Sequence, residues 1–150
     1  MRIGVASDHA GYKLKPGILA FLEEQGVEAV DYGCGEGERV DYVDYALKAL
    51  AGHAAGECDR LLLICGTGIG MSMVGNKHRG IRATLCVDDY MAEMSRAHND
   101  SNCLALGGRI LPLDEALNIV EIWLNTEYEG GRHQERLDKI SRIEEKNFKS

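Results

Sequence analysis

A cysteine followed by closely spaced glycines is the segment of this chain best suited to chemistry. Cys65 ends an apolar run over residues 61–64, which is typical of a buried parallel strand. Alternating glycines let the backbone turn sharply and bring its N–H groups close to a ligand. A helix that begins there would add the positive end of its dipole, which favours a thiolate. We expect a reactive cysteine beside amide donors in the turn of Gly66, Thr67, Gly68, Ile69 and Gly70.

Other polar residues follow apolar segments in the same way. Asp8 and His9 come after the run at 3–6, and Arg109 follows the run at 103–106 and two glycines. Because ligands of open parallel sheets bind beyond the carboxyl ends of the strands, these side chains are candidates for a site. Further candidates lie near helix ends: His98, Asn99, Arg132 and Arg136.

Each candidate also has a purely structural interpretation. Asp8 could be only a turn former or helix cap, and His98 only a helix C-cap. Arg132 and Arg136, four residues apart, share one face of a helix, which is usually a solvated face. Two arginines at a helix start nevertheless oppose the helix dipole, and an anion between them would remove that conflict. Together the candidates indicate a small phosphorylated substrate.

The alternation of apolar runs and amphipathic segments predicts the fold. Five strands alternating with helices favour a three-layer α/β/α, Rossmann-like fold with a parallel sheet in a single domain, residues 1–150. The final helix carries few large apolar residues, so we expect it to extend to a partner subunit. Strands are expected at 3–6, 27–32, 60–65, 81–87 and 103–106, and helices at 14–24, 43–55, 71–77, 88–97, 114–124 and 132–148, with a loop over 33–41.

Composition excludes several classes of function. The net charge is −7 and there is no basic tract, so binding to nucleic acid or to a membrane surface is not expected. The five cysteines are odd in number and form no Cys-x-x-Cys pair, which argues against disulfides and against a cysteine zinc site. No signal peptide or membrane-spanning run is evident at the start of the chain, so we expect a cytoplasmic protein.

These motifs, taken together, resemble the ribose-5-phosphate isomerase type B family, which includes galactose-6-phosphate and allose-6-phosphate isomerases. The resemblance covers nearly the whole chain. It rests on the segments Ser7-Asp8-His9-Ala10-Gly11, Val40-Asp41-Tyr42, 65–71, Asn76-Lys77, 80–83, His98-Asn99-Asp100, 104–109 and 130–134.

The resemblance implies reversible aldose–ketose isomerisation with no metal and no other cofactor. It implies that Cys65 moves a proton between C2 and C1 through a cis-enediolate, which amides of residues 66–70 stabilise. Proton transfers that open the sugar ring would fall to Asp8, Thr67 and His98. Phosphate and substrate contacts would come from His9, Arg109, Arg132, Arg136, Asn99 and Tyr42.

The resemblance also implies a homodimer or homotetramer in which His98, Asn99 and Arg109 reach the neighbouring subunit's site. One branch of the family uses a glutamate in the glycine loop; here Met71 stands at that position, so the cysteine branch fits. Two alternatives remain open. The substrate could be a six-carbon sugar phosphate, or the glycine loop could belong to a nucleotide-binding regulatory module, although Met71 stands where a dinucleotide fingerprint requires glycine.

Overall fold

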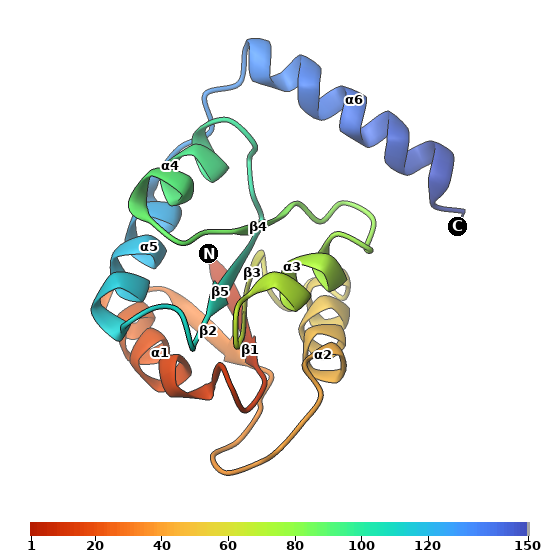
Figure 1. Cartoon of the computed structure of the whole chain (residues 1–150). Helices are drawn as coiled ribbons and strands as arrows, with labels where there is room; N and C mark the ends of the chain where they lie inside the picture. The colour runs from red at the N-terminus through yellow and green to blue at the C-terminus, as the bar shows by residue number, and fades with distance from the viewer. Residues whose placement is uncertain (150) are drawn as a thin grey trace.

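The fold is a parallel sheet covered by helices on both faces (Figure 1). The computed structural model describes residues 1–149. The strands are β1 (Arg2–Ser7), β2 (Glu28–Asp31), β3 (Arg60–Cys65), β4 (Ala83–Leu85) and β5 (Cys103–Gly107). The helices are a 3₁₀ turn (Tyr12–Leu14), α1 (Lys15–Glu24), α2 (Tyr42–Ala54), α3 (Ile69–Gly75), α4 (Asp89–Ala97), α5 (Leu113–Asn125) and α6 (Arg132–Asn147).

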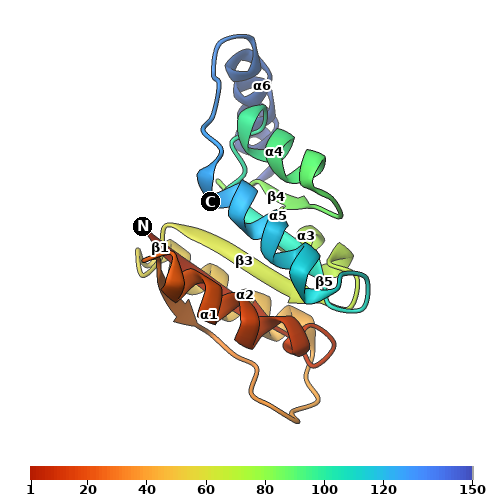
Figure 2. The same ribbon diagram turned by 90° about the vertical axis from the view of Figure 1, so that its left-hand side faces the viewer.

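The five strands lie in the order β2-β1-β3-β5-β4, and all neighbours are parallel. Helices α1, α4 and α5 cover one face, where Trp123 and Ile18 pack on Leu62 and Leu104. Helices α2 and α3 cover the other, where Met71 belongs to the same buried cluster as Leu63. The three-layer α/β/α fold expected from the sequence is therefore confirmed (Figure 2).

Two elements differ from the sequence-based boundaries by more than one residue at an end. β4 is shorter than the expected strand at 81–87, and just before its start an asparagine side chain takes the place of a strand partner. Asn76 hydrogen-bonds both the N–H and the carbonyl of Ala83, at 2.8 and 2.9 Å, and Asn102 accepts from the N–H of Arg82. Helix α3 begins at Ile69 rather than at residue 71, so the glycine turn leads directly into its first turn.

Helix α6 extends across one end of the domain and stands away from the sheet (Figure 1). Its buried residues are His133 and Leu137, whereas Ile140 and Ile143 are at least half exposed. A cavity of about 390 Å³ lies beneath it, lined largely by apolar side chains of α6 and of the connection from α3 to β4. None of the helices described between residues 1 and 149 is long and apolar enough to cross a membrane.

Candidate functional site

Cys65 ends the central strand β3 at the carboxyl edge of the sheet. Its side chain is 5% exposed, and its Sγ accepts a hydrogen bond from the Gly68 N–H at 3.1 Å. Gly68 has a φ of +81°, which turns the chain and presents that N–H to the sulfur. Thr67 is exposed, and its Oγ1 accepts the N–H of Ile69 at the start of α3. The turn therefore points an amide donor at the cysteine.

Close backbone packing joins the three loops at this edge. A Cβ added to Gly11 would lie 2.5 Å from the Ile64 carbonyl oxygen, and one added to Gly107 would lie 2.8 Å from the Thr67 carbonyl. The Gly108 N–H donates to the Cys65 carbonyl at 2.7 Å. The loops after β1, β3 and β5 are thus held against one another, and the glycines are required by contact.

Asp8 and His9 follow β1 beside this turn. The buried Asp8 carboxylate accepts the Gly11 N–H at 2.8 Å, so it does form the turn that the structural interpretation predicts. The exposed His9 has its Nδ1 3.0 Å from the Val40 carbonyl oxygen and 3.2 Å from the Val40 nitrogen. That contact fixes the ring and leaves Nε2 available to a ligand.

A cavity of about 300 Å³ opens beside His9. Arg109, from the loop after β5, lines it together with His9, and a Cβ at Gly66 would lie 3.5 Å from the Arg109 guanidinium. The resemblance implied that Arg109 reaches a neighbouring subunit, but in this chain it lies with His9. Arg39 lines the same cavity and was not singled out in the sequence, because it stands alone in a charged loop.

Tyr42 lies on the other side of the glycine turn. Its ring is so close to Gly70 that a Cβ there would lie 2.6 Å from it. Tyr42 begins α2, whose N-cap Asp41 accepts the Val43 N–H. The capped helix start therefore sets the ring against the turn that carries Cys65.

Three of the other four thiols are poorly suited to ionise. Burial raises the pKa of Cys58, of Cys86 and, most strongly, of Cys103, since a charged sulfur in an apolar interior lacks solvation. All five cysteines are free.

Four of the expected site residues lie at the opposite edge of the sheet. His98 and Asn99 follow α4 in the turn that leads to β5, where the Asn102 carbonyl accepts the Leu61 N–H at the start of β3. Cys65 lies four residues further along that strand, about 13 Å away at 3.3 Å per residue. One chain therefore does not bring His98, Asn99, Arg132 and Arg136 to Cys65.

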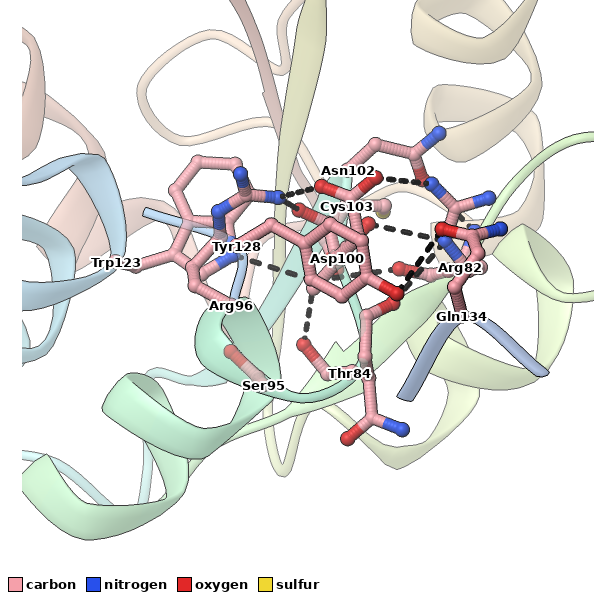
Figure 3. Close-up of polar contacts among 12 residues, drawn as sticks. Arg82, Thr84, Ser95, Arg96, Asp100, Asn102, Cys103, Trp123, Tyr128 and Gln134 are labelled. Carbon is pink, nitrogen blue, oxygen red and sulfur yellow. Dashed lines mark hydrogen bonds and ion pairs between the residues drawn. The ribbon is translucent and has the colours of Figure 1, made fainter. Parts of the chain in front are cut away.

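An arginine pair fixes the turn that carries His98 and Asn99 (Figure 3). Asp100 adopts a left-handed φ of +45°, and its carboxylate meets Arg96 at 2.9 Å and Arg82 at 3.2 Å. Arg82 Nε also donates to the carbonyls of Asn99 and Asp100. The backbone of Asn99 and Asp100 is thus held in one conformation.

The ring of His98 stacks on His133 of α6, with centroids 4.1 Å apart and planes 15° apart. Glu129 Oε2 lies 3.3 Å from His133 Nε2 and 3.9 Å from His98 Nε2. These three residues are near enough to suggest a metal site. A single ion cannot lie in the planes of two nearly parallel stacked rings, however, so the arrangement does not suit metal binding. Arg132 and Arg136 are exposed on the adjacent turns of α6.

Comparison with known proteins agrees with this geometry. A family model described as Ribose/Galactose Isomerase matches residues 3–140. Ribose-5-phosphate isomerase B of Escherichia coli is 48% identical over 145 residues, which is 97% of each chain. A ribose-5-phosphate isomerase B structure from Clostridium thermocellum is 52% identical, with a TM-score of 0.95, and the match covers 99% of this chain and 100% of that one. The Mycoplasma genitalium enzyme, solved with bound ribulose-5-phosphate, is 38% identical, with a TM-score of 0.91 and 97% of each chain covered.

Proposed function

Because the chain belongs to the ribose/galactose isomerase family, we propose that it interconverts ribose 5-phosphate and ribulose 5-phosphate. The names of its relatives support the substrate, including the one solved with ribulose-5-phosphate. The observation that carries the mechanism is Cys65 at the end of β3, with the Gly68 amide 3.1 Å from its sulfur. The free cysteines support a reducing compartment, and we place the enzyme in the cytoplasm.

Cys65 is the base of the proposed reaction. Its thiolate takes the proton from C2 of the open aldose, and the electron pair forms the C1–C2 double bond of a cis-enediolate while the aldehyde oxygen becomes negative. The thiol then returns the proton to C1. The C2 hydroxyl loses its proton as the C2 oxygen becomes the ketone, and the C1 oxygen gains one. Amides of the turn Gly66–Gly70 face the developing negative charge and stabilise it. No redox partner is needed, because hydrogen only moves within the sugar.

The phosphate is assigned to the cationic side chains. His9 and Arg109 line one cavity next to the turn of Cys65, which suits a phosphate held at the far end of a five-carbon sugar. Tyr42 lies against the turn on the opposite side and is proposed as a sugar contact. Asp8 and Thr67, which border the same turn, would assist the proton transfers on oxygen.

A second subunit supplies the rest of the proposed site. His98, Asn99, Arg132 and Arg136 lie beyond the other edge of the sheet, so they can serve a site only in another copy of the chain. The exposed Ile140 and Ile143 and the apolar cavity under α6 support a homodimer or homotetramer that covers them. His98 would then act in ring opening, Asn99 would contact the sugar, and the two arginines would add to phosphate binding.

Replacement of the base tests the mechanism. Cys65→Ala should lower kcat by about 10²- to 10⁴-fold, the range that a positioned base contributes. Cys58→Ala, which removes a buried thiol from the other end of the sheet, is the matched control and should keep kcat. Substantial turnover by Cys65→Ala would refute the assignment. A panel of ribose 5-phosphate, allose 6-phosphate and galactose 6-phosphate, compared by kcat/KM, decides between five- and six-carbon substrates.

Mixing two inactive variants tests the shared site. Cys65→Ala and His98→Ala chains, unfolded together and refolded in equal amounts, should form mixed dimers in which one of two sites is intact. Random pairing in a two-fold dimer then restores about a quarter of the parent activity. No recovery, with mixed dimers demonstrated by mass spectrometry, would show that each chain carries its own complete site.

A further inference from the structure

Glu129 lies where its carboxylate can act on the imidazole of His98. Its N–H donates to the Ala97 carbonyl at 3.0 Å, one residue before His98, which ties the loop before α6 to the end of α4. Gly130 and Gly131 follow with φ of +66° and +57°, so the chain turns back at once into α6. The turn brings His133 over the ring of His98 and leaves the carboxylate of Glu129 facing both rings.

The position of the carboxylate matters because an ionised carboxylate only accepts hydrogen bonds. The His98 atom that faces Glu129 is Nε2, at 3.9 Å, which is longer than a hydrogen bond. The negative charge of the carboxylate nevertheless favours the proton of the neutral ring on Nε2. Nδ1 then carries the lone pair. Among the residues described, none forms a hydrogen bond with either ring nitrogen of His98, so Nδ1 is free to meet a ligand.

We infer that Glu129 is a positioning residue for ring opening: it holds His98 as the Nε2–H tautomer and so directs the basic Nδ1 toward the sugar bound by the neighbouring subunit. This rests on the proposed function. Nδ1 takes the proton of the anomeric hydroxyl, the C1–O4 bond breaks as the aldehyde forms, and O4 leaves with the electron pair. O4 takes a proton from the Thr67 hydroxyl, which regains one from water, and the hydroxide left behind takes the proton that His98 releases.

The surroundings of His98 fit a positioned base. Stacking on the buried His133 fixes the plane of the ring, and the Arg82–Asp100–Arg96 contacts fix the backbone beside it (Figure 3). The tautomer is the one remaining variable, and Glu129 is placed to set it. A carboxylate that orients a histidine in this way is a recurrent device in proton-transfer sites.

The test compares two substrates in Glu129→Gln. With ribose 5-phosphate, which must be opened, kcat should fall about 10- to 100-fold. With 4-deoxyribose 5-phosphate, which has no O4 and cannot close to a furanose, kcat should match that of the parent enzyme. Glu127→Gln removes an exposed carboxylate two residues earlier and should change neither rate. Glu129→Asp, which keeps the charge, should recover part of the loss.

Nitrogen-15 NMR of labelled histidines reads the tautomer directly. The parent should show His98 protonated on Nε2, and Glu129→Gln should show an increased share of the Nδ1–H form. An equal loss of kcat on both sugars, or His98 protonated on Nδ1 in the parent, overturns the assignment of Glu129. Failure of the proposed function looks different: the parent enzyme would then turn over neither sugar, or Cys65→Ala would turn over both.

Discussion

Gly68→Ala should damage both stability and turnover, because this glycine is required by its conformation and by its contacts. Its φ of +81° is unfavourable for alanine, at about 1–2 kcal/mol. The added Cβ would also lie 2.6 Å from Leu85 Cδ1 and 3.0 Å from the Leu106 backbone carbon. Leu85 can shift, but the backbone of the interior strand β5 cannot move freely, and overpacking of this kind costs about 1–3 kcal/mol.

The matched control is Gly26→Ala. Gly26 has a similar φ of +70°, but an added Cβ meets nothing within 4 Å. The control therefore carries only the conformational cost of about 1–2 kcal/mol, whereas Gly68→Ala carries both costs and should lose about 2–5 kcal/mol. The difference between the two variants measures the packing at the glycine turn.

Urea unfolding at one fixed protein concentration measures the free energies, since an oligomer gains stability with concentration. Turnover is measured on the same samples. Gly68→Ala should also lose about 10²-fold in kcat, because a shifted turn removes the Gly68 amide from the site. Gly26→Ala should keep the parent kcat. Equal losses of free energy, or equal kcat values, would refute the argument that contacts at Gly68 hold the catalytic turn.

Three further predictions concern other parts of the chain. Iodoacetamide should modify Cys65 first, and substrate should protect it. The reason is that burial raises the pKa of Cys58, Cys86 and Cys103, which makes these thiols less reactive. Peptide mapping that finds one of those three labelled first would contradict this. Lys15→Met should lower the free energy of unfolding by about 1–3 kcal/mol, because the buried Cys34 carbonyl then lacks its donor at 2.7 Å. An unchanged midpoint of urea unfolding would count against this prediction. The hydrogen bond from the Arg2 N–H lowers the pKa of Asp59 in the folded protein. The contribution of ionised Asp59 to folding stability is therefore present above its unfolded pKa of about 3.9 and is lost as pH falls through the lower folded pKa. Asp59→Asn should lose less stability in acid than the parent, measured by thermal unfolding against pH.

Local features explain why much of the fold could be predicted from the sequence. The run at 61–64 needs only its own apolar residues to indicate a buried strand, and Asp88 caps α4 by accepting the Met91 N–H, as its type and position predict. β4 was overextended at its start, where the side chain of Asn102 takes the place of a strand partner for the Arg82 N–H. This replacement of a strand partner by a side chain depends on tertiary contacts, which no local sequence pattern contains.

The candidate site likewise contains residues that a local motif reveals and residues that only the tertiary fold brings together. Cys65 and its glycines are contiguous, so the sequence displays them as one motif. The pairing of His9 with Arg109 in one cavity depends on β1 and β5 both flanking β3, and the meeting of Glu129 with His98 depends on where α6 begins. Glu129 is one acidic residue in a polar loop, and nothing in its neighbourhood distinguishes it from Glu127.

The placement of His98 at the opposite end of the strands from Cys65 bears on how two chains must meet. In a parallel sheet with returning helices, residues after a strand and residues after a helix lie at opposite edges. Cys65, His9 and Arg109 follow strands, whereas His98 and Asn99 follow α4, and Arg132 lies at the start of α6 beside them. If both groups act on one small sugar, as we propose, two chains must meet with the helix-end residues of one over the strand ends of the other. We propose that helix α6, which stands away from its own sheet, makes that contact, so its loss should abolish the activity together with the oligomer.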